Sequence, residues 1–271
     1  MNMANHGVAL VTGASSGIGL ATAEALRNAG FRVFGTSRRA TAKKSDGTTM
    51  LACDVTDDES VANLVGQVLA EAGRIDLLVN NAGMGLLGAA EESSTVQAQA
   101  LFDVNVFGVL RMTSAVLPAM RHQGKGRIVN VSSALGLIPA PYSALYASTK
   151  HAIEGYSESL DHELRTFGIR VVLVEPGYTR TAFEENLAKP DLLLDIYDSA
   201  RAGMNAIMRK AIESGDAPEV VARTIVKAAT TPAPKRRYAA GKMARQVSLL
   251  RRFVPESAFD KSLRKQNGLP V

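Results

Sequence analysis

The chain has little sulfur chemistry and few aromatic rings. Among its 271 residues there is one cysteine, Cys53, and no tryptophan, and aromatic residues make up 5%. A single cysteine cannot form an intrachain disulfide, which fits a reducing compartment. Nothing near Cys53 in the sequence offers a base that would stabilise a thiolate, so we interpret it as a buried apolar residue at a strand end. The four histidines, His6, His122, His151 and His162, show no metal-ligand spacing with Cys, Asp or Glu, which predicts no catalytic metal.

A targeting segment and a long apolar run are also missing. The N-terminal stretch MNMANHG leads straight into an apolar strand pattern, without the positive, apolar and small-residue regions of a signal peptide. We find no apolar run long enough to cross a bilayer, which predicts that there is no transmembrane segment. With 46% hydrophobic and 21% charged residues, the composition is that of a globular protein, and one α/β domain can absorb residues 1–271. We therefore expect a cytoplasmic protein of one domain.

The formal net charge of +5 does not follow the pattern of a nucleic-acid-binding protein. The basic residues are spread out and lack interleaved aromatic residues on which bases could stack, so we expect no nucleic-acid role. The local exception is a basic C-terminal stretch in which Met243, Val247, Leu250 and Val254 recur at helical spacing. Such a helix could contact an anionic membrane surface, although docking on its own domain or on a second subunit is favoured. The basic residues of this stretch are Lys235, Arg236, Arg237, Lys242, Arg245, Arg251 and Arg252.

A glycine-rich turn follows the first apolar run. Residues 8–11 are β-branched and apolar and lead into TGASSGIG at residues 12–19, after which a helical pattern begins. Strand, tight turn and helix in this order are typical of a dinucleotide-binding fold, although the spacing is GxxxGxG. Gly13 permits the turn, Gly17 lets the backbone approach a pyrophosphate, and Gly19 lets the helix pack closely on its strand. The N–H groups at the helix N-terminus would face the phosphates, and the alternative is an ordinary glycine-rich surface loop.

Tyr146 and Lys150 lie four residues apart in the stretch YASTK. On a helix this spacing places both side chains on one face, and an ammonium beside a phenol favours the phenolate and lowers its pKa. A phenol tuned in this way could protonate a forming alkoxide or take the proton of an alcohol as hydride leaves. The same spacing often arises by chance, so the pair needs support from the rest of the chain.

Several motifs together resemble those of the single-domain branch of the short-chain dehydrogenase/reductase family. They are TGASSGIG, NNAG at residues 80–83, Asn105, Ser133, the pair Tyr146 and Lys150, and the pair Pro176 and Gly177, in the family's order and spacing. The resemblance covers nearly all of residues 8–181. It implies a doubly wound parallel sheet, a nicotinamide cofactor, and oxidation of an alcohol or reduction of a carbonyl. The alternative is a catalytically silent dinucleotide-binding regulatory protein, for which loss of the Tyr or the Lys would be the sign.

The end of the second strand pattern bears on the choice of cofactor. In NAD-binding folds an Asp or Glu about 20 residues after the glycine turn binds the ribose 2′-hydroxyl, and a basic residue replaces it when a 2′-phosphate is bound. Between Glu24 and Asp46 this chain has no carboxylate, and its second strand leads into Ser37, Arg38 and Arg39. A hydroxyl and a guanidinium at that position favour NADP(H). The alternative is that both arginines are solvated surface charges.

The resemblance also gives roles to the remaining candidate residues. Tyr146 is expected to act as acid or base, Ser133 to orient the carbonyl oxygen, Lys150 to perturb the phenol and bind the nicotinamide ribose, and Asn105 to link Lys150 to a proton-relaying water. Ser132 is the rival of Ser133, and the spacing to Tyr146 favours Ser133. The candidate cofactor-binding residues are Gly13, Ser15, Ser16, Gly17, Ile18, Gly19, Ser37, Arg38, Arg39, Asp54, Val55, Asn81, Ala82, Gly83, Tyr146, Lys150, Pro176, Gly177, Thr179 and Thr181.

Among these, Asp54 and Val55 match family positions against the adenine, and residues 81–83 match positions along the adenosine ribose. The alternative for Asp54 is an aspartate of a turn or helix cap. Thr179 and Thr181 match positions that hold the nicotinamide carboxamide, and Thr181 is the better match.

Strand and helix patterns alternate along the chain, which predicts parallel βαβ units and a ligand at the carboxyl ends of the strands. Thr56 and Glu59 form a capping-box signal at the start of the second helix. The helices at 104–123 and 146–167 are expected to form the face of a homodimer or homotetramer, as is common in this family. The strand patterns lie at 8–11, 32–36, 50–53, 77–80, 127–132, 170–175 and 238–240, and the helical patterns at 20–29, 59–72, 104–123, 146–167 and from about 218.

The alternation stops in residues 182–217, which we interpret as a substrate lid that is mobile until substrate binds. Residues 135–142 and the apolar residues after Thr181 would form walls that favour a lipophilic carbonyl or secondary alcohol over a sugar or a charged acid. Some of these apolar residues are expected to belong to the core instead. They are Phe183, Leu187, Leu192, Leu193, Leu194, Ile196, Tyr197, Met204, Ile207 and Met208.

Overall fold

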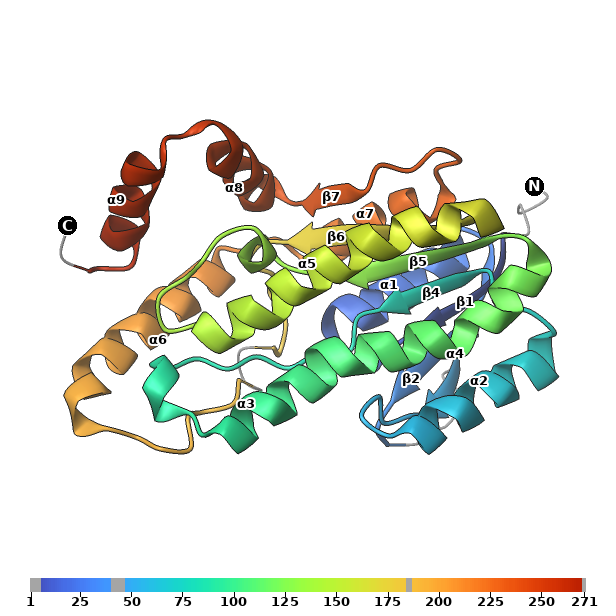
Figure 1. The fold of residues 1–271 in the computed structure, drawn as a ribbon, viewed down its shortest axis with the longest axis horizontal. Helices are drawn as coiled ribbons and strands as arrows, with labels where there is room; N and C mark the ends of the chain where they lie inside the picture. The colour runs from blue at the N-terminus through green and yellow to red at the C-terminus, as the bar shows by residue number, and fades with distance from the viewer. Residues whose placement is uncertain (1–5, 40–46, 184–186, 270–271) are drawn as a thin grey trace.

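The computed structural model describes residues 6–39, 47–183 and 187–269. Seven parallel strands form one sheet in the order β3-β2-β1-β4-β5-β6-β7, with helices on both faces (Figure 1). This is the expected doubly wound α/β fold, and the strand order reverses between β1 and β4. The strands are β1 (Gly7–Val11), β2 (Phe31–Ser37), β3 (Thr49–Ala52), β4 (Leu77–Asn80), β5 (Gly126–Val131), β6 (Ile169–Pro176) and β7 (Arg237–Ala240).

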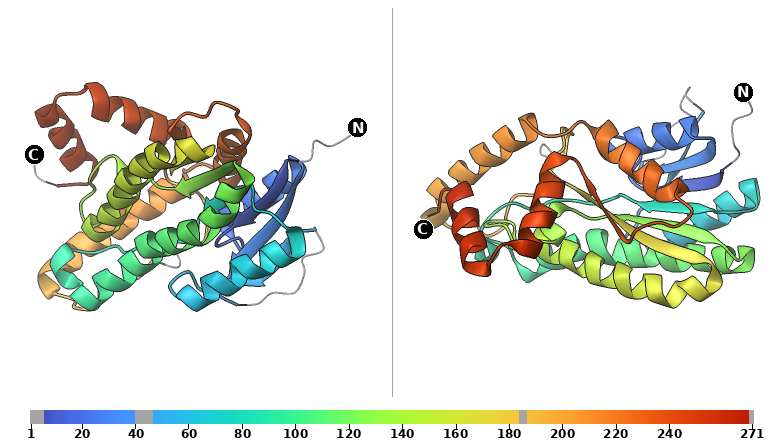
Figure 2. Two further views of the ribbon diagram at one scale, coloured as in Figure 1. Left: turned by 45° about the vertical axis from the view of Figure 1, so that its right-hand side comes forward. Right: turned by 90° about the horizontal axis from the view of Figure 1, so that it is seen from above.

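The helices follow the strands as crossover connections, and two further helices extend the C-terminus. In both views of Figure 2 the last two helices stand beyond β7 at one end of the molecule. The α-helices are α1 (Gly17–Asn28), α2 (Asp58–Ala72), α3 (Thr95–Phe102), α4 (Gly108–Gln123), α5 (Ala144–Leu164), α6 (Asp198–Glu213), α7 (Pro218–Thr230), α8 (Lys242–Phe253) and α9 (Glu256–Gln266). Short helical turns are η1 (Ala90–Glu92), η2 (Asp103–Phe107), η3 (Ala134–Gly136), η4 (Arg165–Phe167) and η5 (Asp195–Tyr197).

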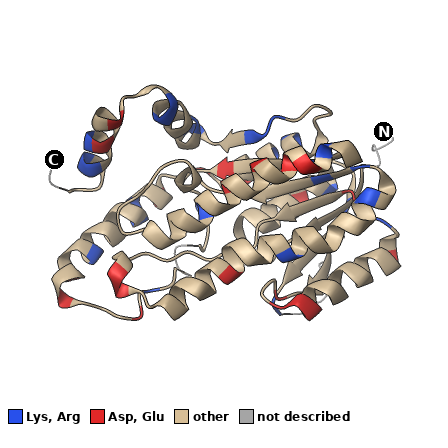
Figure 3. Ribbon diagram, viewed as in Figure 1, with Lys and Arg blue, Asp and Glu red and all other residues tan. Residues whose placement is uncertain are grey.

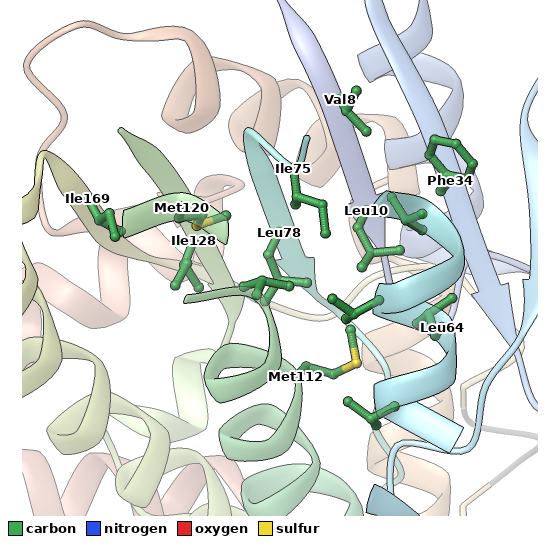
Figure 4. Close-up of a cluster of buried hydrophobic side chains, with 14 of the residues drawn as sticks. Val8, Leu10, Phe34, Leu64, Ile75, Leu78, Met112, Met120, Ile128 and Ile169 are labelled. Carbon is green, nitrogen blue, oxygen red and sulfur yellow. The ribbon is translucent and has the colours of Figure 1, made fainter. Parts of the chain in front are cut away.

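The sheet is buried on both faces because its strands alternate apolar side chains between two core clusters. Leu10 of β1 packs in the cluster that contains Leu64 of α2 and Met112 of α4 (Figure 4). Its neighbour Val11 points to the opposite cluster, which contains Ile225 of α7. Strands that are covered on both sides read as continuous apolar runs, which is why the sequence reveals them clearly.

The long helix expected over residues 104–123 begins earlier and is not regular. Its first segment, α3, starts at Thr95, where the hydroxyl of Ser94 caps the helix by accepting a hydrogen bond from the Gln97 N–H at 3.1 Å. Ser94 and Gln97 have capping-box spacing, a signal that could have located this start. The π-helical turn η2 then joins α3 to α4.

The cap of α2 also differs from the expectation. Asp57, and not Thr56, is the N-cap, and its carboxylate accepts a hydrogen bond from the Glu59 N–H at 2.9 Å. The Thr56 hydroxyl instead donates to the Asp54 carboxylate at 2.7 Å. A carboxylate at this end of a helix is also stabilised by the helix dipole, which favours Asp57 as the cap.

By length and composition, the continuous helix over Thr95–Gln123 could cross a membrane, and it is the one such span in the described part of the chain. This corrects the expectation that no apolar segment is long enough, because the helix starts at Thr95. Its inward side chains Met112, Val116 and Met120 are fully buried against the sheet. That packing is typical of a core helix in a globular domain.

Candidate functional site

The expected site residues gather at the carboxyl edge of the central strands. The glycine turn follows β1, the NNAG residues end and follow β4, Ser133 follows β5, and Gly177 follows β6. These strands are adjacent and parallel, so their ends meet at one edge of the sheet. The edge includes the point at which the strand order reverses, where open α/β sheets bind ligands.

Three glycines allow the turn after β1 to close tightly. Gly13 and Gly17 have φ values of 65° and 53°, in the left-handed region that disfavours a side chain. A Cβ atom on Gly19 would lie 2.1 Å from the carbonyl oxygen of Gly13, so only glycine fits there. At Gly17 the same atom would lie 3.2 Å from the side chain of Thr181, which brings the segment after β6 against the turn.

The N-terminus of α1 fits the phosphates of a dinucleotide. Its N-cap residue, Ser16, makes no side-chain hydrogen bond to the helix, and the first turn holds no acidic residue. The first N–H groups of a helix have no partner inside it and carry a partial positive charge. Together with the left-handed Gly17, these groups form a cradle for a pyrophosphate, and Ser15 and Ile18 lie in the same turn.

Thr12 and Asn81 join the glycine turn to the end of β4. The Asn81 side-chain amide donates to the carbonyl oxygens of Thr12 at 2.9 Å and Gly13 at 3.2 Å. The Thr12 hydroxyl accepts from the backbone N–H groups of Asn81 at 3.0 Å and Ala82 at 2.9 Å. Thr12 was not among the expected site residues, although its place at the strand end was a signal. The structure thus gives the Asn81 side chain a part in holding the two loops together.

The end of β2 carries the expected hydroxyl and guanidinium groups. Ser37 is the last residue of the strand, and Arg38 and Arg39 follow it with exposed side chains. Hydrogen bonds from Thr56, together with the nearby charge of Arg38, hold the pKa of Asp54 below its usual range. Asp54 is therefore a turn aspartate that also faces Arg38. Residues 40–46, which come next in the chain, lie outside the described residues.

Val55 and Gly83 have packing positions close to this edge. The Val55 side chain is buried in the core, where it limits the space at Gly108 of α4. A Cβ atom on Gly83 would lie 3.2 Å from the side-chain oxygen of Asn105. The loop after β3 can therefore pack against Gly108 at the start of α4, and the loop after β4 can approach Asn105 because Gly83 has no side chain.

Tyr146 lies in the first turn of α5 and faces Ser133. The Ser133 hydroxyl lies close enough to the phenol to lower its pKa, whereas the Ser132 hydroxyl affects Glu154 instead. The structure thus brings Ser133, and not its rival, to the phenol. The Lys150 ammonium lies 5.6 Å from the centroid of the Tyr146 ring and donates to the carbonyl oxygen of Val131 at 3.0 Å.

The pKa of Tyr146 is shifted in the direction opposite to the one expected from the sequence. Loss of contact with water raises the pKa of Tyr146 to about 12, and the hydrogen bond with Ser133 offsets only part of this. Burial also lowers the pKa of Lys150 to about 8, against the opposing effect of Glu154. Desolvation penalises the charged form of each group, and here it outweighs the attraction between ammonium and phenolate. The phenol is therefore protonated at neutral pH.

Asn105 lies inside the π-helical turn and holds the loop after β4. Its side-chain oxygen accepts from the Met84 N–H at 2.9 Å, and its amide donates to the Met84 carbonyl at 2.9 Å and to the Thr149 hydroxyl at 3.2 Å. The turn itself is closed by a bond from the Gly108 N–H to the carbonyl oxygen of Asp103. Asn105 thus connects the helix of residues 95–123, the NNAG loop and α5 at a single buried point. Turns of this kind occur frequently at functional sites.

The two threonines after β6 have different surroundings. The Thr179 hydroxyl donates to the Gly177 carbonyl at 3.2 Å and is buried, so it serves the turn after Pro176. The Thr181 hydroxyl accepts from the Phe183 N–H at 3.2 Å, and its side chain lies against Gly17 of the glycine turn. Thr181 is therefore the one that lies beside the phosphate cradle.

The candidate lid is anchored to the loop before α3 by a buried carboxylate. The side chain of Glu92 is fully buried and accepts from the Leu194 N–H at 3.0 Å and the Ala89 N–H at 3.1 Å. It also forms an ion pair with Arg201 of α6. No local sequence pattern marks Glu92, because its partners in the lid, Leu194 and Arg201, lie about a hundred residues further along the chain. Residues 184–186 of the lid lie outside the described part.

The apolar residues of the lid divide between core, site and solvent. Met204 is buried, whereas Ile196 is 84% exposed. The ring of Phe183 lies 6.1 Å from the ring of Tyr146, and a Cβ atom on Gly85 would come within 2.4 Å of Leu187. Phe183 and Leu187 are therefore the lid residues that lie closest to the expected chemistry.

A cluster of three carboxylates lies behind Lys150. Arg237 of β7 forms ion pairs with Glu154 at 2.8 Å, Glu158 at 3.1 Å and Glu175 at 3.2 Å, so a single guanidinium pairs with three carboxylates. Burial and the neighbouring Glu154 raise the pKa of Glu175 to about 8. This placement corrects the assignment of Arg237 to a basic helical face, because its side chain turns toward the acids of α5 and β6.

Replacing Glu175 by Gln is expected to stabilise the protein at alkaline pH. The pKa of Glu175 is about 8 in the folded protein and is expected to be near the ordinary value of 4.5 in the unfolded chain. The protonated carboxyl therefore contributes its full stability below pH 4.5, and this contribution is lost as the pH rises through 8. The variant cannot ionise, so its unfolding free energy relative to the unmodified protein should rise by at least about 1 kcal/mol between roughly pH 5 and pH 9. Thermal and denaturant unfolding at several pH values measure this. The exposed Glu163→Gln serves as control, and equal pH dependence in the two variants would contradict the assignment.

Comparison with known proteins agrees with this geometry. Residues 7–191 match the family model described as short chain dehydrogenase. The chain is 36% identical over 260 residues to the 3-ketodihydrosphingosine reductase of Bacteroides thetaiotaomicron, and the aligned region covers 95% of this chain and 96% of that protein. It is also 36% identical over 242 residues to retinol dehydrogenase 8 of Bos taurus, with 80% and 76% covered.

Solved structures of the same kind superpose over almost the whole chain. A short-chain dehydrogenase from Streptomyces avermitilis matches with a TM-score of 0.81 and 35% identity, over 97% of this chain and 98% of that one. Two further relatives at 26% identity were crystallised with a cofactor, one from Burkholderia cenocepacia with NADP (TM-score 0.76, 94% and 96% covered) and one from Burkholderia phymatum with NAD (TM-score 0.78, 96% and 97% covered). The matches span the glycine turn, the sheet and α5, so the chain belongs to the short-chain dehydrogenase family of oxidoreductases, whose members use a nicotinamide cofactor.

Proposed function

We propose that the protein is an NADP(H)-dependent oxidoreductase that reduces the carbonyl group of a lipophilic substrate, with Tyr146 as the proton donor. The observation that carries this proposal is the placement of the Tyr146 phenol beside Ser133 and the buried Lys150 at the carboxyl edge of the sheet. The glycine cradle opens at the same edge of the sheet. A dinucleotide on that cradle and a carbonyl beside the phenol would be neighbours.

Each residue of the group has a distinct part in the proposed reaction. When bound, the reduced nicotinamide supplies the hydride that the carbonyl carbon receives. Ser133 donates a hydrogen bond to the carbonyl oxygen, and Tyr146 transfers its proton to that oxygen as the alkoxide forms. The charge of Lys150 then stabilises the phenolate, which lies in surroundings too dry to stabilise it otherwise. Asn105 keeps α5 and the NNAG loop in register through Thr149 and Met84.

The protonation state of the phenol fits the reduction of a carbonyl. With a pKa of about 12, Tyr146 carries a proton at neutral pH that it can give to an alkoxide. Alcohol oxidation needs the phenolate instead, and the positive ring of the oxidised nicotinamide would help to form it. The same group would therefore serve both directions, and the ratio of oxidised to reduced cofactor would set the net direction.

The site residues would hold the cofactor from three sides. The N-terminus of α1 and the turn residues Ser15 to Ile18 would hold its phosphates, with Thr181 beside that turn, and Lys150 would bind the ribose next to the phenol. Arg38 and Ser37 at the end of β2 would bind a 2′-phosphate. The sequence has no carboxylate between Glu24 and Asp46, so it lacks the acidic residue that binds the ribose 2′-hydroxyl in NAD-binding folds.

A lipophilic substrate is supported by the side chains beside the phenol. Phe183 and Leu187 of the lid lie over Gly85, and the Phe183 ring approaches that of Tyr146. The names of two relatives, a 3-ketodihydrosphingosine reductase and a retinol dehydrogenase, support the same class of substrate. A lid of residues 182–217 anchored by Glu92 would close over such a substrate and exclude water.

The oligomeric state and the compartment extend this proposal. The outer faces of α4 and α5 would join two copies of the chain. Both helices cover the same face of the sheet, and Phe107, the last residue of the turn before α4, is half exposed. A cytoplasmic location fits the single free thiol of Cys53, which is buried and unpaired.

Replacing Arg38 by Asp should shift the cofactor preference from NADPH toward NADH. The carboxylate repels a 2′-phosphate and accepts a hydrogen bond from a 2′-hydroxyl, so the ratio of the two dissociation constants should change by roughly a hundredfold or more. Fluorescence titration with both cofactors measures the ratio. Arg223→Asp, which makes the same charge change on the exposed face of α7, should leave it unchanged. Tighter binding of NADH than of NADPH by the unmodified protein would overturn the assignment of cofactor.

Tyr146→Phe should lower the rate of carbonyl reduction by roughly 10²–10⁴-fold while the affinity for NADPH stays close to that of the unmodified protein. The ring still packs, but the proton donor is gone. Lys150→Ala should reduce both rate and affinity, because the ammonium serves the phenol and the ribose. Tyr156→Phe, ten positions along the same helix, is the control and should keep its rate. Near-normal turnover by Tyr146→Phe would refute the assigned role.

A panel of carbonyl compounds tests the substrate class. Long-chain and polycyclic ketones should give the highest kcat/KM, and sugars the lowest, because the lid places apolar side chains next to the phenol. Oxidation of NADPH, followed by absorbance, measures each rate. A clear preference for the sugars would exclude the lipophilic assignment and leave the oxidoreductase assignment intact, whereas no turnover with any member would favour a catalytically silent binding protein.

A further inference from the structure

The net positive charge of the whole chain is concentrated in its last two helices. The C-terminal stretch from the start of α8 to the end of α9 contains seven of the 31 basic residues and two of the 26 acidic residues. It therefore carries +5, and the remaining 24 basic and 24 acidic residues cancel. Figure 3 shows the blue segments on these helices, which stand apart from the sheet. The charged residues are Lys242, Arg245, Arg251, Arg252, Lys261, Arg264 and Lys265, against Glu256 and Asp260.

One face of α8 docks on the domain to which it belongs. Ala244 is buried, and the side chain of Met243 comes within 3.3 Å of the Cβ position of Gly177 at the end of β6. Val247 is half buried, one turn further along the same face. Of the two alternatives favoured from the apolar pattern, its own domain or a second subunit, this face of the helix contacts its own domain. The contacts of Met243 and Ala244 also set how the helix is turned about its axis, and therefore which of its residues face away from the domain.

The opposite face of α8 exposes two large apolar side chains. Leu249 and Phe253 are 59% and 71% exposed, and Leu250, which lies in line with Met243 at the border of the docked face, is 46% exposed. Leu249 and Phe253 are one turn apart, so they lie on one side of the helix, and Arg245 and Arg252 fall beside them at the spacing of an α-helix. The Arg252 guanidinium lies 5.5 Å from the centroid of the Phe253 ring. This face is defined by Lys242, Arg245, Leu249, Arg252 and Phe253, with Leu250 at its border, and we call it the outer face of α8.

Helix α9 folds back toward the loop that follows Ser133. Arg251 lies 5.6 Å from the centroid of the Phe259 ring, which joins the two helices. A shallow hollow of about 130 Å³ is lined by Arg251, Phe259 and Leu263 on one side and by Pro139 on the other. Pro139 belongs to the loop expected to form a wall of the substrate site. The outer face of α8 is thus carried by a hairpin that lies next to that wall.

We propose that the outer face of α8, together with the basic side chains of α9, binds the surface of a membrane that contains anionic phospholipids. A helix with apolar side chains between basic ones lies in the plane of a lipid surface, where the rings and leucines enter the acyl boundary and the cations meet the headgroups. A second copy of this chain is a poorer occupant, because two copies of the segment from α8 to α9 would bring +5 against +5. A nucleic acid would leave the leucines exposed to water.

The consequence for the protein is a peripheral association that brings the site close to lipid. The docked face of α8 contacts Gly177 after β6, and α9 reaches the loop after β5 at Pro139, so both helices contact segments that leave the carboxyl edge of the sheet. A lipophilic carbonyl dissolved in the bilayer would then have a short path to the site. This last step rests on the proposed function, but the binding of lipid does not.

Sedimentation of the full-length protein with lipid vesicles tests the proposal without any activity. Vesicles of phosphatidylcholine alone are compared with vesicles that also contain phosphatidylglycerol, at low and at high salt. The protein should sediment with the anionic vesicles and be released by salt. The pair Leu249→Ser and Phe253→Ser should weaken this binding by roughly tenfold or more, because both apolar groups leave the lipid. Arg245→Glu with Arg252→Glu should weaken it by at least as much.

Matched variants elsewhere on the surface serve as controls. Val96→Ser with Phe167→Ser removes exposed apolar groups, and Arg121→Glu with Arg223→Glu makes the same charge change, and neither pair should alter vesicle binding. Circular dichroism checks that each variant is folded. The proposal is overturned by equal binding to neutral and anionic vesicles, by no binding, or by equal loss in the control variants. It is also overturned if the Leu249 and Phe253 changes dissolve an oligomer in the absence of lipid, or if the protein prefers duplex DNA to the vesicles.

Discussion

The burial of charged and polar groups along one stripe of α5 is the constraint on which the proposed chemistry depends. Tyr146, Lys150, Glu154 and Glu158 follow one another at four-residue intervals, so they share a helical face directed at the ends of β5 and β6. Burial raises the pKa of the phenol to about 12 and lowers the pKa of the ammonium to about 8, and Glu154 opposes the shift of the ammonium. Arg237, brought in by β7, provides the positive charge that the two carboxylates need.

The fold supplies this stripe with a cofactor edge on one side and an apolar cover on the other. The glycine turn closes because Gly19 leaves room for the carbonyl of Gly13, and Asn81 fastens the turn to β4. Opposite the turn, Glu92 holds the lid through the Leu194 N–H and Arg201. The glycine turn, the phenol and the lid would thus supply the cofactor site, the proton donor and the cover that the proposed carbonyl reduction requires, and short connections after parallel strands bring these segments together.

Much of the fold and the position of the site could be predicted from the sequence, because the relevant signals are local. Strands buried on both faces read as apolar runs, and the glycine turn and the spacing of Tyr146 and Lys150 are contiguous motifs. Properties set by contacts distant in sequence could not be predicted. The direction of the Tyr146 pKa shift depends on burial, the function of Glu92 on partners in the lid, and the orientation of Arg237 on acids from α5 and β6. The start of α3 was missed although Ser94 and Gln97 signalled it.

The most direct test of the account is the transfer of deuterium from NADPH labelled at the nicotinamide C4 to a lipophilic ketone, followed by mass spectrometry of the product. The account predicts one deuterium at the carbinol carbon of the alcohol, with the hydroxyl proton taken from solvent by way of Tyr146. A protein that binds the labelled nucleotide at the glycine turn and yet reduces no member of a broad ketone panel would contradict it, because the stripe along α5 would then hold a dinucleotide without using it.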